Sequence, residues 1–204
     1  DWSSDVCSSD LAAIFAPVIT SLPPTVAELR DSILPPGGAT DGGALHILGT
    51  DLFGRDVFSR VVYGARISLS VAAVVTVIGG VIGTLLGIVA GYVGGVTDGI
   101  IMRLADLVFS LPTILIAIAV AVVLGPSFFN LVIVISLMIW PTFARQVRGE
   151  AMAIARSDYV TYAVSAGISS WRIMLRHVLP NVVPTLLVLI TLEIGRVVLL
   201  EATL

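Results

Sequence analysis

Side chains that commonly act as nucleophiles, bases or metal ligands are scarce in this sequence of 204 residues. It contains two histidines, His46 and His177, and one cysteine, Cys7. His46 has no second ligand at metal-binding spacing, and the sequence offers no Ser/His/Asp or Cys/His set. The phosphate-binding pattern G-x-x-x-x-G-K-S/T is missing as well. We therefore expect a chain that is not an enzyme and that holds no metal or cofactor.

One polar segment stands out, residues 145–181, RQVRGEAMAIARSDYVTYAVSAGISSWRIMLRHVLPN. It carries five of the eleven basic residues but only two acidic ones, Glu150 and Asp158. Long apolar runs flank the segment, so it cannot lie in hydrocarbon, and its arginine excess predicts a place on the cytoplasmic side of a membrane. A short amphipathic hairpin in that place is suited to docking on a partner protein.

Capping residues in this segment predict helix, break, helix. Ser157 can cap a first helix, and Gly167 can supply its left-handed stop. Ser169 or Ser170 can cap a second helix, and Pro180 opens the next element. The second helix has an apolar face whose residues recur at helical spacing, Trp171, Met174, Leu175 and Val178, and a second face that carries Arg172 and Arg176.

Bulk composition decides the class of protein. Hydrophobic residues make up 57% of the chain and charged residues 12%, and the mean hydropathy is +1.05. Soluble domains carry about 25% charged residues, so this composition indicates an integral membrane protein. We expect an all-α, polytopic fold that sits in a lipid bilayer and has no nucleic-acid partner.

The N-terminal residues differ from the rest. Residues 1–11, DWSSDVCSSDL, look like the translation of a sequencing adapter, with a native disordered tail as the alternative. Without Asp1, Asp5 and Asp10 the formal charge of −3 becomes 0. Residues 12–19 are apolar but too short to span alone, so we expect the end of a truncated transmembrane helix. Both ends of the chain are expected to be truncated.

Residues 20–66 are expected to form an extracytoplasmic loop region, and the transmembrane domain is expected at 67–204. The loop is rich in proline and glycine and then becomes densely charged. Asp56 and Arg60 lie at i,i+4 spacing on an expected helix and can pair. Two interpretations of these charges stay open with even odds, a solvated, self-paired surface and a role specific to transport.

Four apolar runs are expected to cross the bilayer, 67–93, 100–124, 127–143 and 182–200. Gly79, Gly83 and Gly87 form a small-xxx-small pattern that allows close helix approach, although glycine is common in transmembrane helices generally. The segment 94–99, GGVTDG, is expected to form a tight inside turn, and 125–126 an outside break.

Several residues in the runs carry their own expectations. Pro112 can kink the second run, and Trp140 with Pro141 should close the third near the interface. Two pairs of opposite charge sit three residues apart, Arg103 with Asp106 and Glu193 with Arg196. Charges inside a span suggest function by default, but for Glu193 and Arg196 we favour a structural pair.

Two motifs resemble one known family, the permease subunit of bacterial ABC importers for dipeptides, oligopeptides or nickel. LGTDLFGRDVFSRVVYGARISL, residues 48–69, is similar to the segment that marks the C-type permease of a pair. SDYVTYAVSAGISSWRIMLRHVLPN, residues 157–181, resembles the cytoplasmic EAA loop. The resemblance covers nearly everything from Leu11 onward. It implies the type I importer permease fold with six transmembrane helices, of which this chain would hold four and part of another.

The EAA loop spans 145–180 by this resemblance, with Gly167 at the family's glycine and Leu179-Pro180 at its closing pair. The family's Glu-Ala-Ala falls on Thr161, Tyr162 and Ala163, so its acidic residue is absent here. The residues that the resemblance assigns to ATPase coupling are Ser157, Asp158, Tyr159, Thr161, Tyr162, Ala163, Ala166, Gly167, Ser169, Trp171, Arg172, Arg176, His177, Leu179 and Pro180.

The family further implies partners and a place in the cell. These are two ABC ATP-binding subunits that hold ATP and Mg²⁺, a second permease subunit and an extracytoplasmic binding protein, in the bacterial inner membrane. We expect half of a translocation path for di- or oligopeptides, with nickel as an alternative. Other classes fit less well: a secondary transporter would show internal repeats, a membrane enzyme would need catalytic side chains in its spans, and a scaffold would not need the arginine-rich hairpin.

Overall fold

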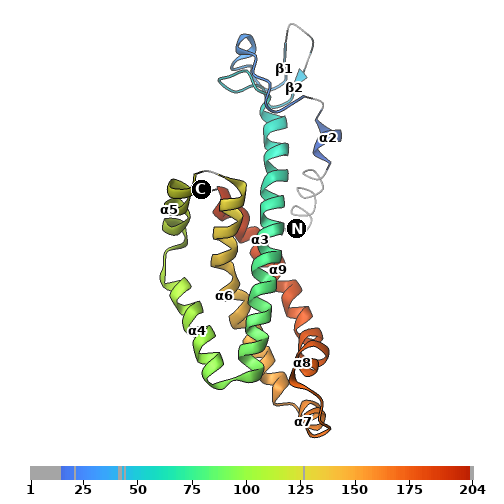
Figure 1. Cartoon of the computed structure of the whole chain (residues 1–204). Helices are drawn as coiled ribbons and strands as arrows, with labels where there is room; N and C mark the ends of the chain where they lie inside the picture. Colours follow the sequence, from blue (N-terminus) through green and yellow to red (C-terminus); the bar gives the residue numbers. More distant parts are fainter. Residues whose placement is uncertain (1–14, 21, 41–42, 44, 126, 203–204) are drawn as a thin grey trace. The chain divides into compact units, whose positions relative to one another are not determined.

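The computed structural model describes residues 15–20, 22–40, 43, 45–125 and 127–202 and is mainly helical (Figure 1). Its residues divide into two compact units, residues 1–70 and 71–204, and each is considered separately below. Residues 1–11 and the first part of 12–19, for which the sequence analysis gives expectations, lie outside the described residues. Residues 15–19 contain only a short helix, α2 (Ala16–Ile19).

The first unit has little regular structure before its last segment. A 3-10 turn covers Leu29–Asp31, and two short strands, β1 (Gly38–Ala39) and β2 (Leu45–His46), pair antiparallel with Gly38 opposite His46. This composition of turns agrees with the proline and glycine content of the segment. An irregular segment thus leads into a long helix.

Helix α3 (Val57–Val93) is continuous over 37 residues and begins ten residues before the expected start at residue 67. Its start is fixed by Asp56, whose Oδ2 accepts a hydrogen bond from the Ser59 backbone N–H at 2.7 Å. An aspartate at this position satisfies one of the free donors of a helix N-terminus. A bilayer crossing needs only about 20 residues, so α3 combines one span with the charged motif that precedes it.

Helices α4 (Gly95–Ser110) and α5 (Thr113–Leu124) form a broken pair, bent by 79°. The break confirms the expectation for Pro112, and its cause is local. A residue before proline avoids the helical region, and Leu111 is extended, with φ −95° and ψ 129°. The expected turn at 94–99 is much shorter than predicted, because α4 already begins at Gly95.

Helix α6 (Phe128–Ala155) runs unbroken through Pro141. The sequence predicted that Trp140 and Pro141 close this span, but both residues lie inside the helix and are buried. Residues 145–155, expected to begin the polar loop, are the last three turns of this helix. Figure 1 shows α4 and α5 lying along α6, and contacts between the helices agree.

Helices α3 and α6 pack in parallel through a row of glycines. A Cβ atom on Gly79 would lie 3.2 Å from the Ser136 carbonyl oxygen, and one on Gly91 would lie 2.6 Å from that of Arg148. Because contacts advance along both helices together, the two helices run in the same direction. This confirms the close approach expected from Gly79, Gly83 and Gly87, and the row extends one turn further.

The chain then turns through α7 (Asp158–Ser165) and α8 (Ser170–Ile173) into a long final helix. A π-helical turn, Met174–Val178, joins α8 to α9 (Leu179–Ala202) without a break. Pro180 thus lies inside a helical stretch rather than opening one, and Pro184 lies inside α9 as well. The wider turn just before Pro180 is a common way to accommodate its missing N–H.

The core of the second unit is apolar and shared by three helices. Its main cluster joins α3, α6 and α9 and includes Val75, Ile135, Phe143 and Val197. By length and composition, three stretches among the described residues can cross a membrane, Val57–Val93, Phe128–Ala155 and Ser170–Ala202. A fourth span is added if the bent pair α4–α5 counts as one. The all-α, polytopic fold expected from the sequence is thus confirmed.

Candidate functional site

The candidate site is the elbow, which we define as residues 156–178 between α6 and α9. Its first helix, α7, ends at a tight turn. Gly167 has φ +78°, its N–H donates to the Val164 carbonyl, and the Ile168 N–H donates to the Ala163 carbonyl. These two bonds make a Schellman motif, which favours glycine at this position. The left-handed stop expected at Gly167 is confirmed.

The serine caps differ in detail from expectation. Ser157 and Ser169 do occupy the residues that precede α7 and α8, but neither side chain caps a backbone N–H. The Ser157 hydroxyl donates instead to the Ile154 carbonyl at the end of α6. The helix boundaries were therefore predictable from residue type, whereas the hydrogen bonds were not.

The elbow is anchored to the rest of the second unit by apolar contacts. Val160, Ala163 and Ile173 are buried together, and Ile168 and Tyr92 pack against them. A second cluster joins the π-helical turn to α3 and α6 through Met174, Val178, Ile88 and Val147. Displacement of α7 or α8 would therefore disturb the packing of the bundle.

Polar contacts add to this attachment. The Tyr159 and His177 rings lie 6.1 Å apart between centroids. The Asn181 amide donates to the His177 carbonyl at 2.6 Å and approaches the Tyr159 hydroxyl at 3.4 Å. Further up, Thr185 donates to Glu150, which ties α9 to α6. Thr185 and Asn181 could not be predicted from the sequence, because single polar residues near a span carry no pattern.

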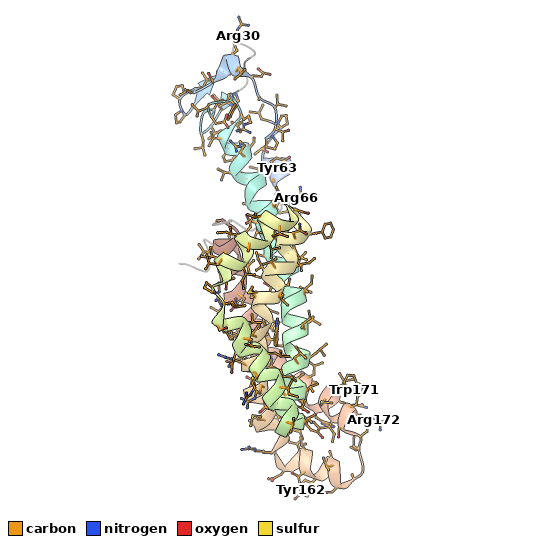
Figure 2. All side chains as sticks on the ribbon, turned by 60° about the vertical axis from the view of Figure 1, so that its left-hand side comes forward. Arg30, Tyr63, Arg66, Tyr162, Trp171 and Arg172 are labelled. Atoms are coloured by element: carbon orange, nitrogen blue, oxygen red, sulfur yellow. The ribbon has the colours of Figure 1, made fainter. Side chains whose placement is uncertain are left out.

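Most residues assigned to coupling are exposed. Figure 2 shows Tyr162, Trp171 and Arg172 extending from the elbow, and Tyr162 and Trp171 are 74% and 60% exposed. The other exposed members are Asp158, Tyr159, Thr161, Ala166, Gly167, Ser169, Arg176 and Pro180. Of the rest, Ala163 is buried, and Ser157, His177 and Leu179 are half-buried. The elbow therefore presents an aromatic and basic surface on a buried support.

The expected apolar face of the second helix is only partly buried. Met174 and Val178 face the core, together with Ile173, whereas Trp171 and Leu175 are exposed. Trp171 and Leu175 line a small apolar cavity of about 160 Å³ against α3. Helical spacing alone could not separate these two sides, because both are apolar.

Two of the five arginines of residues 145–181 form ion pairs with α4 and are not part of the elbow. Arg148 pairs with Asp98 through two nitrogens, and Arg145 pairs with Asp106 while its guanidinium lies 4.3 Å from the Phe109 ring centroid. Asp106 thus pairs across helices and not with Arg103, its expected neighbour. Asp98 was missed because a partner 50 residues away leaves no local signal.

The remaining three arginines are Arg156, Arg172 and Arg176, and all are exposed. No ion pair is formed by any of them within the ranges that the structure describes. Asp158 is the acidic residue of the elbow. The surface therefore keeps a net positive charge that is available to a partner.

The charged motif of the first unit folds on itself. Asp51 accepts hydrogen bonds from the backbone N–H groups of Phe53 and Arg55 at 2.9 and 3.0 Å and pairs with the side chains of Arg55 and Arg60. Burial raises the pKa of Asp51, but these hydrogen bonds outweigh it and lower that pKa from 3.8 to about 2. Arg60 therefore pairs with Asp51 and not with Asp56.

Asp56 has a different partner, the buried ring of His46. The His46 Nδ1 lies 2.8 Å from the Asp56 Oδ1, and both side chains are less than a tenth exposed. Burial raises the pKa of Asp56, but hydrogen bonds from Ser59 and His46 outweigh it, so the pKa lies below its ordinary value. The sequence left two interpretations of these charges open, a self-paired surface and a role specific to transport. The geometry of Asp51, Arg55 and Arg60 is that of a self-paired surface.

Two glycines of the same motif are required by close backbone approach. A Cβ on Gly49 would lie 2.3 Å from the Leu34 carbonyl oxygen, and one on Gly54 would lie 1.8 Å from that of Glu28. Both residues have positive φ, +78° and +73°. The motif thus fixes a particular fold of the segment that precedes α3.

The structural pair favoured for α9 is formed between a buried glutamate and an exposed arginine. The Arg196 Nη1 lies 3.5 Å from the Glu193 Oε1, and Glu193 is 6% exposed. In the part of the chain that is described, no cluster of three or more His, Cys, Asp or Glu side chains could hold a metal ion.

Comparisons with known proteins agree with this architecture. Residues 83–204 match the family described as binding-protein-dependent transport system inner membrane component. The chain is 39% identical over 194 residues to a D,D-dipeptide transport system permease protein, DdpC, of Escherichia coli (strain K12), covering 95% of this chain and 63% of that protein. It is 43% identical over 159 residues to the glutathione transport system permease protein GsiD of Escherichia coli O6:H1, covering 78% and 52%.

The chain thus spans between half and two thirds of the length of these relatives. The residues of the family match include the C-terminal end of α3, the bent pair, α6, the elbow and α9. Membrane-spanning helices, the elbow and the family match lead to one conclusion. This chain belongs to the binding-protein-dependent inner membrane component family, the permeases of ABC importers, and is a multi-pass bacterial inner-membrane protein and not an enzyme.

Proposed function

We propose that this chain supplies half of the translocation path of an ATP-driven peptide importer, and that the elbow is where an ATP-binding subunit pushes on it. A second permease subunit would complete the path, and an extracytoplasmic binding protein would deliver the substrate. ATP and Mg²⁺ would be bound by the ATPase subunits. Relatives named as D,D-dipeptide and glutathione transport permeases support small peptides as the substrate class.

The observation that carries the coupling role is the construction of the elbow. Its outer surface combines exposed aromatic rings with arginines that have no ion pair among the described residues. Aromatic residues and arginine dominate the binding energy of protein interfaces. A partner with an acidic, apolar groove would match this surface.

The attachment of the elbow supports a mechanical role. Residues Ser170–Ala202 form one helical stretch of 33 residues, so a push on α8 acts directly on the span α9. On the other side, α7 follows α6 after only two residues, Arg156 and Ser157. A rigid-body rotation of the elbow would therefore move two spans together, which could switch access between the two membrane sides.

The proposal is tested at Gly167 in the complete transporter, reconstituted in proteoliposomes. A Cβ atom there meets no atom within 4 Å, but φ is +78°, so the backbone of Gly167→Val is strained by about 1–2 kcal/mol. We expect Gly167→Val to reduce peptide uptake per ATP hydrolysed by about tenfold or more. Gly167→Asn is the matched control, because asparagine tolerates this conformation, and should keep most of the coupling.

Two outcomes would contradict the proposal. Normal uptake per ATP in Gly167→Val would remove the elbow from the coupling step. Loss of protein from the membrane, with normal coupling in the remaining molecules, would mean that Gly167 only ends a helix. Cysteines introduced at Ala166 and Ser169 provide a direct measurement, since both should crosslink to an ATP-binding subunit.

A further inference from the structure

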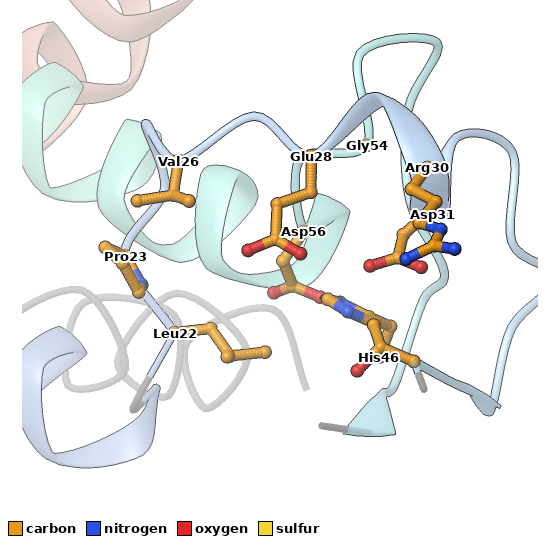
Figure 3. A pocket seen from close by; sticks show the side chains of 10 residues that line it. Leu22, Pro23, Val26, Glu28, Arg30, Asp31, His46, Gly54 and Asp56 are labelled. Atoms are coloured by element: carbon orange, nitrogen blue, oxygen red, sulfur yellow. The ribbon is translucent and has the colours of Figure 1, made fainter. Parts of the chain in front are cut away.

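A cavity of about 550 Å³ lies within the first unit, beside the start of α3. Volumes of about 300–1,000 Å³ are usual for small-molecule sites. Glu28, Asp31 and His46 line this space, and Figure 3 shows Asp56 beside the His46 ring. Its other wall is apolar and consists of Leu22, Pro23 and Val26. Nothing in the family match, which begins at residue 83, assigns a role to it.

His46 is oriented by its hydrogen bond to Asp56. The Asp56 carboxylate also accepts the Ser59 N–H, which holds it at the start of α3. An ionised carboxylate only accepts hydrogen bonds, so His46 donates from Nδ1, and in the neutral tautomer that this bond selects the lone pair is on Nε2. His46 is 94% buried, as its exposed fraction is 6%, and within the described ranges no hydrogen bond to Nε2 is formed. The ring therefore offers an unpartnered acceptor to the cavity that it lines.

Two more acceptors share the cavity. The carboxylates of Glu28 and Asp31 line it, and neither forms a side-chain hydrogen bond or ion pair with any residue that the structure describes. Arg30 is the basic side chain of the lining, against the three carboxylates of Glu28, Asp31 and Asp56. The lining is thus rich in acceptors and carries an acidic excess.

We propose that this cavity binds a primary ammonium group, with His46 Nε2, Glu28 and Asp31 as its three acceptors. A primary ammonium carries one positive charge and three donors, which matches this set in number and sign. The apolar wall would contact a hydrophobic side chain next to the ammonium. The ammonium site rests on the cavity alone, whereas its assignment to the amino terminus of a short peptide rests on the proposed function.

The test uses the full chain in nanodiscs with ¹⁵N-labelled histidine. The sequence contains only His46 and His177, so His177 in the elbow is an internal reference. L-alanyl-L-phenylalanine is titrated at pH 7, with its N-acetylated form as the matched control ligand. We expect a saturable shift of the His46 Nε2 resonance with the free dipeptide, none with the acetylated form, and no change at His177.

Variants separate binding from folding. His46→Gln would also disturb Asp56, so the main variant is Glu28→Gln, which changes an exposed carboxylate without a structural partner. Glu28→Gln should weaken the binding of the dipeptide about tenfold. Glu201→Gln on α9 is the control variant and should leave the binding unchanged. An equal shift with the acetylated dipeptide, or none with either, would overturn the proposal. Titration with 2-phenylethylamine shows whether the site requires a peptide. If this amine binds as tightly as the dipeptide, the site recognises the ammonium group alone.

The two proposals fail separately. Loss of the histidine shift would leave the uptake measurements on Gly167 variants unaffected. Conversely, normal coupling in Gly167→Val would not alter the binding of the dipeptide to the isolated chain.

Discussion

Glycine has at least two distinct uses in this chain, and they can be separated by experiment. At Gly83 the constraint is space, because an added Cβ would lie 2.3 Å from the Trp140 carbonyl oxygen. At Gly167 the constraint is the backbone angle, and space is free. At Gly64, on the same helix as Gly83, neither constraint applies. The sequence alone could not distinguish these cases, since the close contact at Gly83 depends on a helix that begins 45 residues later.

Alanine substitutions in α3 should therefore have opposite effects. Gly83→Ala forces α3 away from the α6 backbone and should lower the free energy of unfolding by roughly 1–3 kcal/mol. Gly64→Ala meets no atom and should raise it by about 0.5–1 kcal/mol, because alanine is the better helix former. Unfolding by SDS titration from detergent micelles, followed by circular dichroism, measures both. Equal shifts in the two variants would contradict the glycine-mediated packing of α3 on α6.

Acid should loosen the motif before α3 at an unusually low pH. The pKa of Asp51 is lowered to about 2 in the folded chain from 3.8. A lowered pKa contributes stability above about pH 3.8 and loses it as the pH falls toward 2. The backbone amide of Phe53, which donates to Asp51, should report this in an NMR titration with a midpoint near 2. The Asp51→Asn variant should show no such step, and a midpoint near 3.8 in the unmodified chain would contradict the assignment.

Among the elements, α6 departed most from expectation, and its ion pairs explain why. Arginines at residues 145 and 148 suggested that the span ends near Phe143. The helix continues to Ala155 because both arginines find aspartates on α4. Local sequence shows the charge but not the partner, so the polar segment appeared longer than it is. By contrast, the Schellman turn at Gly167 and the break at Pro112 depend on adjacent residues and were predictable.

The two ion pairs between α4 and α6 should differ in strength. Asp98–Arg148 is half-buried and has two contacts, whereas Asp106–Arg145 is about half exposed on both sides. Double-mutant cycles with alanine should give a coupling of about 1–2 kcal/mol for the first pair and less than about 0.5 kcal/mol for the second. Unfolding in micelles is again the measurement. Equal coupling energies would mean that burial does not control these pairs.

In the second unit as a whole, the direction of the helices decides how the chain crosses the membrane. Helices α3 and α6 are parallel, as the advancing glycine contacts show. Two parallel spans must be joined by a segment that crosses back, so the bent pair α4–α5 has to make that crossing. The kink at Leu111 and Pro112 therefore lies within a span, rather than at the tip of a re-entrant loop. Hydropathy predicted the number of crossings, but only the packing excludes re-entry.

Membrane sidedness is the remaining consequence, and cysteine labelling on intact cells tests it. With Cys7 replaced by serine, single cysteines at Leu52 and Ser127 should react with an impermeant maleimide from outside. Cysteines at Val96 and Ala166 should react only after permeabilisation, because arginine places the elbow inside. All four positions are exposed. Labelling of Ser127 and Val96 from one side would contradict a crossing by α4–α5. A complete reversal of the pattern would put the elbow outside, where no cytoplasmic ATPase could reach it.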